Sequence, residues 1–178
     1  LLIDDEPEVH EVTRLVLGGF RFEGKTLQFL SAYSVNEAKQ LIQNNDDIAV
    51  TLLDVVMETD TAGLDLVKYI RDELNNHQIL IVLRTGQPGQ APEHEIISNY
   101  DINDYKEKTE LTAQKMATAM FAALRAYRDI MTIEANKKGL ERVLAASSSI
   151  NENKKPTEFA SAVLSQLTAL VGLARGAW

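Results

Sequence analysis

Residues with reactive or metal-binding side chains recur at the ends of short apolar segments in the first 108 residues. They are Asp4, Asp5, Asp54, Thr85 and Lys106. Carboxylates gathered in one place repel one another unless a cation joins them, and their oxygen atoms suit Mg²⁺. A carboxylate beside such a cation can attack phosphorus to form an acyl phosphate, whose oxygens a hydroxyl or an amine then contacts. The residue types therefore indicate Mg²⁺-dependent phosphoryl chemistry, with Thr85 and Lys106 at the phosphoryl oxygens.

These side chains meet only if the segments before them form a parallel sheet. The apolar segments alternate with stretches whose apolar residues recur about every 3.6 positions, which is typical of strand–helix units. Ligands of an open parallel sheet bind beyond the carboxyl ends of its strands. We therefore predict an α/β fold with a five-stranded, doubly wound parallel sheet. The predicted strands are Leu1–Ile3, Leu27–Ala32, Ile48–Leu53, Ile79–Leu83 and Ile102–Tyr105.

Local signals mark the connections between these elements. Ser34, followed three residues later by Glu37, predicts a capping box at a helix start, and Pro92 marks the first turn of another helix. Residues 19–26 match the P-loop pattern letter for letter. A P-loop leads from a strand into a helix, whereas this segment leads from a helix into a strand, so we expect a connecting turn.

Composition restricts the class of protein. The chain has 178 residues, 45% hydrophobic and 25% charged, which is ordinary for a globular protein. It has no cysteine, which excludes thiol catalysis, and no apolar stretch long enough to span a bilayer, so we expect a cytoplasmic protein. Residues 1–108 carry nine Lys and Arg against twenty Asp and Glu. This acidity argues against direct binding of nucleic acid and favours binding of a cation.

A different pattern begins at Thr112. From there to Ser147 the chain has no proline and is rich in good helix formers, which predicts one long helix. Its apolar positions continue past the part that can cover a sheet, so we expect a homodimer through residues 112–150. Polar residues lead to Pro156, and an amphipathic helix follows. The predicted parts are a domain over 1–127, a linker helix over 128–155 and the start of an incomplete second domain over 156–178.

Four short motifs in this order resemble the receiver domain of bacterial response regulators over residues 1–127. They are DD after the first strand, LLDVVM at the third, RTG at the fourth and YK at the fifth. The resemblance implies a flavodoxin-like receiver fold and a signalling switch rather than an enzyme. It also implies a histidine kinase or a phosphotransfer protein as phosphoryl donor, with neither a membrane nor nucleic acid as a direct partner.

The resemblance also implies a role for each site residue. Asp54 would be the phospho-acceptor, and Asp5, Asp54 and the Val56 carbonyl would hold Mg²⁺, with Asp4 bound to it through water. Gly86 would leave room for the phosphoryl oxygens. The residues implied to contact the phosphoryl group are Thr85 and Lys106.

Some positions depart from the receiver pattern. Lys106 is followed by Glu107, where receivers usually have proline, and Glu58 replaces another common proline. The residue three before Lys106, usually Tyr or Phe, is Asn103. Tyr105 does not replace that aromatic, because adjacent residues of a strand point to opposite faces.

The runs YDINDYKEKTELTAQK and ALRAYRDI resemble a narrower group, in which a receiver continues through a helix into a GAF-like domain and often into an HD-type phosphohydrolase. Residues 157–178 resemble the opening helix of such a GAF-like domain, and the sequence contains no HD motif. Two alternatives to the switch stay open. One is a phosphohydrolase with an aspartate nucleophile, although such enzymes generally have a second Asp where this chain has Val56. The other is a dimerisation module that works without phosphorylation.

Overall fold

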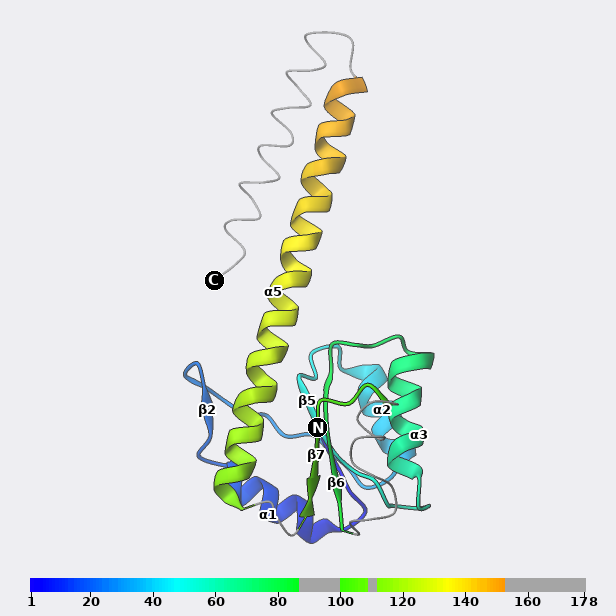
Figure 1. Cartoon of the computed structure of the whole chain (residues 1–178), viewed down its shortest axis with the longest axis vertical. Coiled ribbons are helices and arrows are strands. Elements are labelled where there is room, and N and C mark those ends of the chain that lie inside the picture. Colours follow the sequence, from blue (N-terminus) through cyan, green and yellow to red (C-terminus); the bar gives the residue numbers. More distant parts are fainter. Residues whose placement is uncertain (87–99, 109–111, 153–178) are drawn as a thin grey trace. The chain divides into compact units, whose positions relative to one another are not determined.

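A five-stranded parallel sheet forms the centre of the fold, which confirms the predicted α/β class (Figure 1). The computed structural model describes residues 1–86, 100–108 and 112–152, with side chains up to residue 145. The strand order is β4-β1-β5-β6-β7, and every neighbouring pair is parallel. The strands are β1 (Leu2–Ile3), β4 (Ser31–Ala32), β5 (Val50–Asp54), β6 (Leu80–Thr85) and β7 (Asp104–Glu107).

Helices cover both faces of this sheet, as a doubly wound fold requires (Figure 1). Val82 of β6 packs in one core cluster with Met120, whereas its neighbour Ile81 packs in the other with Leu66. Successive residues of a buried strand serve opposite faces, so β6 is apolar throughout most of its length. The helices over the first face are α1 (Pro7–Leu17) and, up to Ile130, the long helix α5 (Ala113–Glu152). Those over the second are α2 (Val35–Asn44) and α3 (Ala62–Lys68), which continues as the π-helical turn η1 (Tyr69–Glu73).

The start of α2 shows the predicted cap. Ser34 Oγ accepts a hydrogen bond from the Glu37 backbone N–H at 3.2 Å, and the Glu37 carboxylate accepts one from the Tyr33 N–H at 2.7 Å. A third acceptor comes from another loop, because Glu58 Oε1 accepts the Val35 N–H at 2.9 Å. Glu58, which stands where receivers usually have proline, therefore satisfies a backbone donor that the helix itself leaves unpaired.

The segment that matches the P-loop pattern is a hairpin. Its strands are β2 (Arg21–Phe22) and β3 (Lys25–Thr26), which pair antiparallel. The two residues between them, Glu23 and Gly24, both have positive φ values, of 50° and 79°. Two central residues with positive φ form the tight turn that suits the twist of a two-stranded ribbon. The segment thus runs from α1 into a hairpin, which excludes a phosphate-binding loop opening a helix.

This hairpin packs against α5. The ring centroids of Phe20 and Phe121 lie 4.5 Å apart, and those of Phe22 and Phe121 lie 6.4 Å apart. At the hairpin tip, Glu23 pairs with Arg128 at 2.7 Å. Aromatic contacts and an ion pair therefore join the hairpin to α5 at Phe121 and Arg128.

The long helix runs without interruption from Ala113 to Glu152. The chain divides into two compact units, Leu1–Ile130 and Met131–Trp178. In the described part of the second unit, apolar side chains of α5 are exposed, and Leu140 is 60% exposed. The helix predicted to begin at Pro92 and the one predicted after Pro156 lie outside the described residues. No helix in the described part is long and apolar enough to cross a membrane.

Candidate functional site

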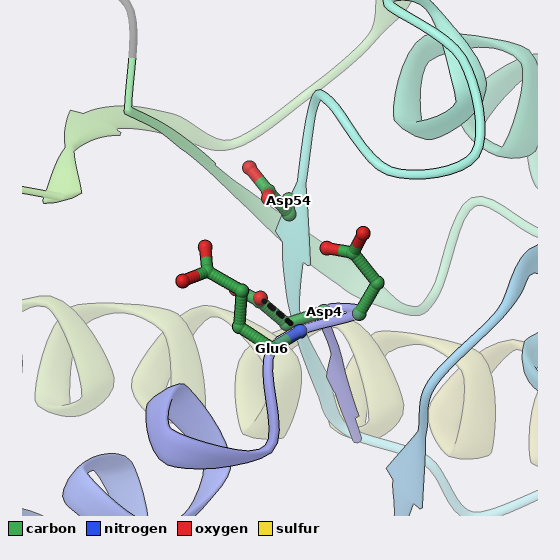
Figure 2. Close-up of side chains that lie close together, drawn as sticks. Asp4, Glu6 and Asp54 are labelled. Atoms are coloured by element: carbon green, nitrogen blue, oxygen red, sulfur yellow. Dashed lines mark hydrogen bonds between the residues drawn. The ribbon is translucent and has the colours of Figure 1, made fainter.

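Four acidic residues meet at the carboxyl ends of β1 and β5. They are Asp4, Asp5, Glu6 and Asp54, and one carboxylate oxygen of each lies within 4.8 Å of the others. Figure 2 shows Asp4, Glu6 and Asp54 at this edge of the sheet. Asp4 and Asp54 are buried, at 0% and 3% exposure, whereas Asp5 and Glu6 are exposed. The structure thus brings the three predicted acids together and adds Glu6, which was not predicted.

Strand register explains why Asp4 lies beside Asp54. In the pairing of β1 with β5, Ile3 lies opposite Leu53, so the next residue of each strand is an aspartate at the same level. The Asp54 backbone is in turn packed against the start of α3. A Cβ atom on Gly63 would lie 2.0 Å from the Asp54 carbonyl oxygen, so only glycine fits there. The Gly63 N–H donates to the Val55 carbonyl at 3.0 Å, which fixes the loop that follows the acceptor strand.

The lysine that reaches these acids is Lys108, whereas the predicted Lys106 pairs elsewhere. Lys108 Nζ lies 2.9 Å from Asp54 Oδ2 and 3.2 Å from Asp4 Oδ2. It also lies 2.9 Å from Glu6 Oε1. Lys106 Nζ instead pairs with Asp104 at 2.8 Å.

The register of the sheet gives the physical reason for this difference. Arg84 lies opposite Asp54 on one side and opposite Lys106 on the other. Lys106 is therefore two strands away from Asp54, roughly 10 Å at the usual strand spacing, with the Arg84 side chain on the strand between them. Lys108 directly follows Glu107, the last residue of β7. Because the sheet has ended there, the Lys108 side chain can reach across the carboxyl ends of the strands to Asp54.

A sequence signal for Lys108 existed in the receiver pattern itself. The residue three before Lys108 is Tyr105, an aromatic, whereas the residue three before Lys106 is Asn103. Tyr105 is buried in the core cluster on the α2 and α3 side of the sheet. Counting from Lys108 therefore restores the aromatic of the pattern, while the proline that usually follows the lysine is still missing.

Burial and charge act against each other at Asp54. Burial raises the pKa of Asp54, and the hydrogen bond and positive charge of Lys108 oppose that rise. Burial alone would lower the pKa of Lys108, but its hydrogen bonds to Asp54 and Glu6 outweigh this and raise it. Oδ1 of Asp54 is buried and has no hydrogen-bond partner in the described part of the chain. An all-oxygen cluster with one unsatisfied carboxylate oxygen fits Mg²⁺, which prefers such donors.

The other predicted residues lie on neighbouring elements. Thr85 is the last residue of β6 and is buried, and Gly86 directly follows it. Val56 is half-buried in the loop two residues after Asp54. Arg84, next to Thr85, was not predicted to take part in the site. It is buried on the same strand and pairs with Asp4.

Comparisons of the sequence with known proteins found a matching family and a relative. A family described as "Domain of unknown function (DUF3369)" matches residues 120–177. The chain is 52% identical over 173 residues to a protein of Vibrio cholerae serotype O1, "3'3'-cGAMP-specific phosphodiesterase 2". That match covers 97% of this chain and 33% of the other, so the chain spans about a third of the length of this relative.

Two solved structures have the same architecture over most of the chain. The first, "adenylate cyclase from Rhodopirellula baltica", superposes with a TM-score of 0.66 at 18% identity, covering 77% of this chain and 94% of the other. The second is a response regulator receiver domain protein from Clostridium thermocellum, with a TM-score of 0.59 at 21% identity, covering 72% and 95%. These similarities show that the chain has the fold of receiver domains.

Proposed function

We propose, with the receiver fold as the premise, that this chain is a phosphorylation-controlled switch in which Asp54 accepts a phosphoryl group. One observation carries the proposal: the buried Asp54 carboxylate, with one oxygen that has no hydrogen-bond partner among the described residues, lies among three other acids and 2.9 Å from Lys108. Burying such a group costs free energy. A site of this kind therefore suggests a function that depends on Asp54.

The transfer itself needs little from the protein beyond position and charge. A carboxylate oxygen of Asp54 forms a bond to phosphorus while the P–N bond of a phosphohistidine breaks, and the imidazole nitrogen keeps the electron pair. The donor would be a histidine kinase or a phosphotransfer protein. We assign Lys108, in place of Lys106, to the transferred oxygens, because its Nζ already lies beside Asp54. Thr85, at the end of the adjacent strand, would offer its hydroxyl.

Mg²⁺ would be held by Asp5, Asp54 and the Val56 carbonyl, with Asp4 acting through water. When bound, the cation neutralises negative charge on the carboxylates and the phosphoryl oxygens. Phosphorylation changes the charge on Asp54 from about −1 to about −2. It therefore alters the balance between the negative charge of the acidic cluster and the positive charge of Lys108.

The signal would pass along α5 to an attached domain. The relative from Vibrio cholerae supports an output of the cyclic-dinucleotide phosphodiesterase type, in line with the HD-type phosphohydrolase that the narrower group often carries. This sequence contains no adjacent His-Asp pair, so we assign hydrolysis to no residue of this chain. We keep the boundaries 1–127, 128–155 and 156–178 as proposed parts, the last as the start of a GAF-like domain, in a cytoplasmic protein.

A second candidate function is self-association through α5. Ile133, Leu140 and Leu144 are 65%, 60% and 59% exposed and are spaced by seven and four residues. Such spacing favours a seam between two helices. Dimerisation that does not depend on phosphorylation would need only this seam.

Phosphoryl transfer from acetyl phosphate tests the first proposal. Intact mass should rise by one phosphoryl group in the parent with Mg²⁺, and the label should be absent with EDTA and in Asp54→Asn. The exposed Asp60, six residues further along, provides a matched control, so Asp60→Asn should label as the parent does. Labelling of Asp54→Asn to the parent's extent would refute the assignment, and association that is equal with and without the label would favour the second candidate.

A further inference from the structure

An arginine is buried beneath the acidic cluster. Arg84 is 2% exposed and lies on β6, where Leu80 and Val82 of the same face belong to the apolar core against α1 and α5. A guanidinium group in such a place is unfavourable unless its charge is paired. Packing alone would be served by an apolar residue, so this arginine requires another explanation.

The contacts of Arg84 point to Asp4. Its Nη2 donates a hydrogen bond to Asp4 Oδ2 at 3.3 Å, and its Nη1 donates to Thr13 Oγ1 at 3.2 Å. Thr13 is itself buried and donates to the Val9 carbonyl at 2.7 Å. The Nε atom of Arg84 has no hydrogen-bond partner among the described residues. The group is thus held from below by α1, with its charge directed at Asp4.

Asp4 is consequently fixed at both of its oxygens. Oδ1 accepts the Glu6 N–H at 3.1 Å, drawn as a dashed line in Figure 2, while Oδ2 accepts from Arg84. Arg84 also lies opposite Asp54 in the sheet, and its carbonyl accepts the Val55 N–H at 3.0 Å. The arginine is therefore tied to both strands that carry the buried acids.

Arg84 and Lys108 both bring positive charge to the cluster, but in different ways. Lys108 lies at the rim on a flexible stem, with a side chain that is 20% exposed, so an arriving cation can displace it. Arg84 is enclosed and remains protonated throughout the physiological pH range. Its charge is thus present whether or not a cation or a phosphoryl group is bound.

We propose that Arg84 is a positioning residue that acts through Asp4: it holds the Asp4 carboxylate in place and, as a permanent counter-charge, lowers the affinity of the acidic cluster for a divalent cation. This inference rests on the proposed Mg²⁺-dependent function. Four carboxylates face two cations in the resting cluster. Without Arg84 the same carboxylates would attract Mg²⁺ more strongly.

Calorimetric titration of the full chain with Mg²⁺ at constant ionic strength tests this inference. Arg84→Met and Arg84→Gln remove the charge, and we expect the Kd for Mg²⁺ to fall about tenfold in both. Arg84→Lys keeps the charge and should stay within about twofold of the parent. Arg71→Met is the matched control. Arg71 is also buried, but it donates to the carbonyls of Asn76, Ile79 and Asp101 at the other end of the sheet.

The possible results separate this inference from the proposed function. A parent that binds Mg²⁺ and labels at Asp54, with folded neutral variants that bind no more tightly than the parent, overturns the role of Arg84 alone. The same holds if neither neutral variant folds, because Arg84 would then serve only to stabilise buried Asp4. An equal gain in Arg71→Met would also overturn it. A parent that binds no Mg²⁺ overturns the proposed function together with this inference.

Discussion

Replacement of Lys108 by methionine should destabilise the protein, and the same replacement at Lys106 should not. Lys108 Nζ lies within 3.2 Å of the buried acids Asp4 and Asp54, and Lys106 pairs only with the partly exposed Asp104 among the described acids. The two lysines are separated by one residue, so chain position and the change in composition are matched. The difference between the two variants in the free energy of unfolding therefore measures how much more a lysine stabilises the protein when the acids it pairs with are buried.

The expected size follows from burial. Removing one partner of a buried ion pair typically costs about 3–5 kcal/mol, because the other charge is left without compensation. The side chain of Lys108 is 20% exposed and Arg84 still faces Asp4, so we expect about 2–3 kcal/mol for Lys108→Met. Lys106 and its partner are each 32% exposed, and pairs of that kind contribute about 0–1 kcal/mol.

Urea unfolding at pH 7 measures both values, and its pH dependence identifies the acids involved. Burial already raises the pKa of Asp54, and loss of Lys108 should raise it further. The cost of Lys108→Met should therefore be largest at neutral pH and should shrink as pH falls through this raised pKa, because a protonated carboxyl needs no counter-charge. Mg²⁺ should also stabilise Lys108→Met more than the parent, since it replaces the missing charge.

Two results would refute this reasoning. One is a cost for Lys106→Met that equals or exceeds the cost for Lys108→Met. The other is a folded Lys108→Met variant whose stability equals that of the parent at neutral pH. Either would mean that Lys108 does not neutralise the buried acids in solution.

Three further outcomes are expected. Asp54→Asn should raise the melting temperature at pH 7, because burial raises the pKa of Asp54 and so disfavours its ionised form in the folded protein. The gain should vanish below pH 3.8, the ordinary pKa of an aspartate, since the carboxyl is then protonated in the folded and the unfolded protein. A lower melting temperature of the variant at pH 7 would contradict this. Phe121→Ala should lower the free energy of unfolding in urea by about 1–2 kcal/mol, because it removes the ring that packs at a tilt against Phe20, whereas a neutral effect would show that the hairpin does not hold α5. Leu140→Glu combined with Leu144→Glu should give monomers by light scattering, because unpaired charges in an apolar seam cost several kcal/mol; an unchanged assembly state or a monomeric parent would exclude the seam.

The sequence alone was enough to predict the architecture and three of the four acids that the structure brings together. Alternating β-rich and helix-period segments encode strand–helix units locally, and parallel strands bring their carboxyl ends to one edge. Asp4 and Asp5 are the two residues after β1, and Asp54 ends β5, so their meeting point depends only on the order of the elements. The capping box of Ser34 and Glu37 is likewise a local feature, because these two residues lie within one helical turn, whereas the further acceptor Glu58 comes from another loop.

Only the tertiary structure decided which basic groups face these acids. Lys106 and Lys108 are the same residue type, two positions apart, so a strand would direct both side chains to the same face. Lys106 lies within β7 and is paired with β6, whereas Lys108 lies just beyond the end of β7. That depends on the register of β6 with β7, which arises from packing over the whole sheet and not from a local pattern. Arg84 became a partner of Asp4 for the same reason: 80 residues separate the two in the chain, and the sheet and α1 enclose both. Long-range register and burial, which local periodicity does not encode, therefore set the charge balance of the site.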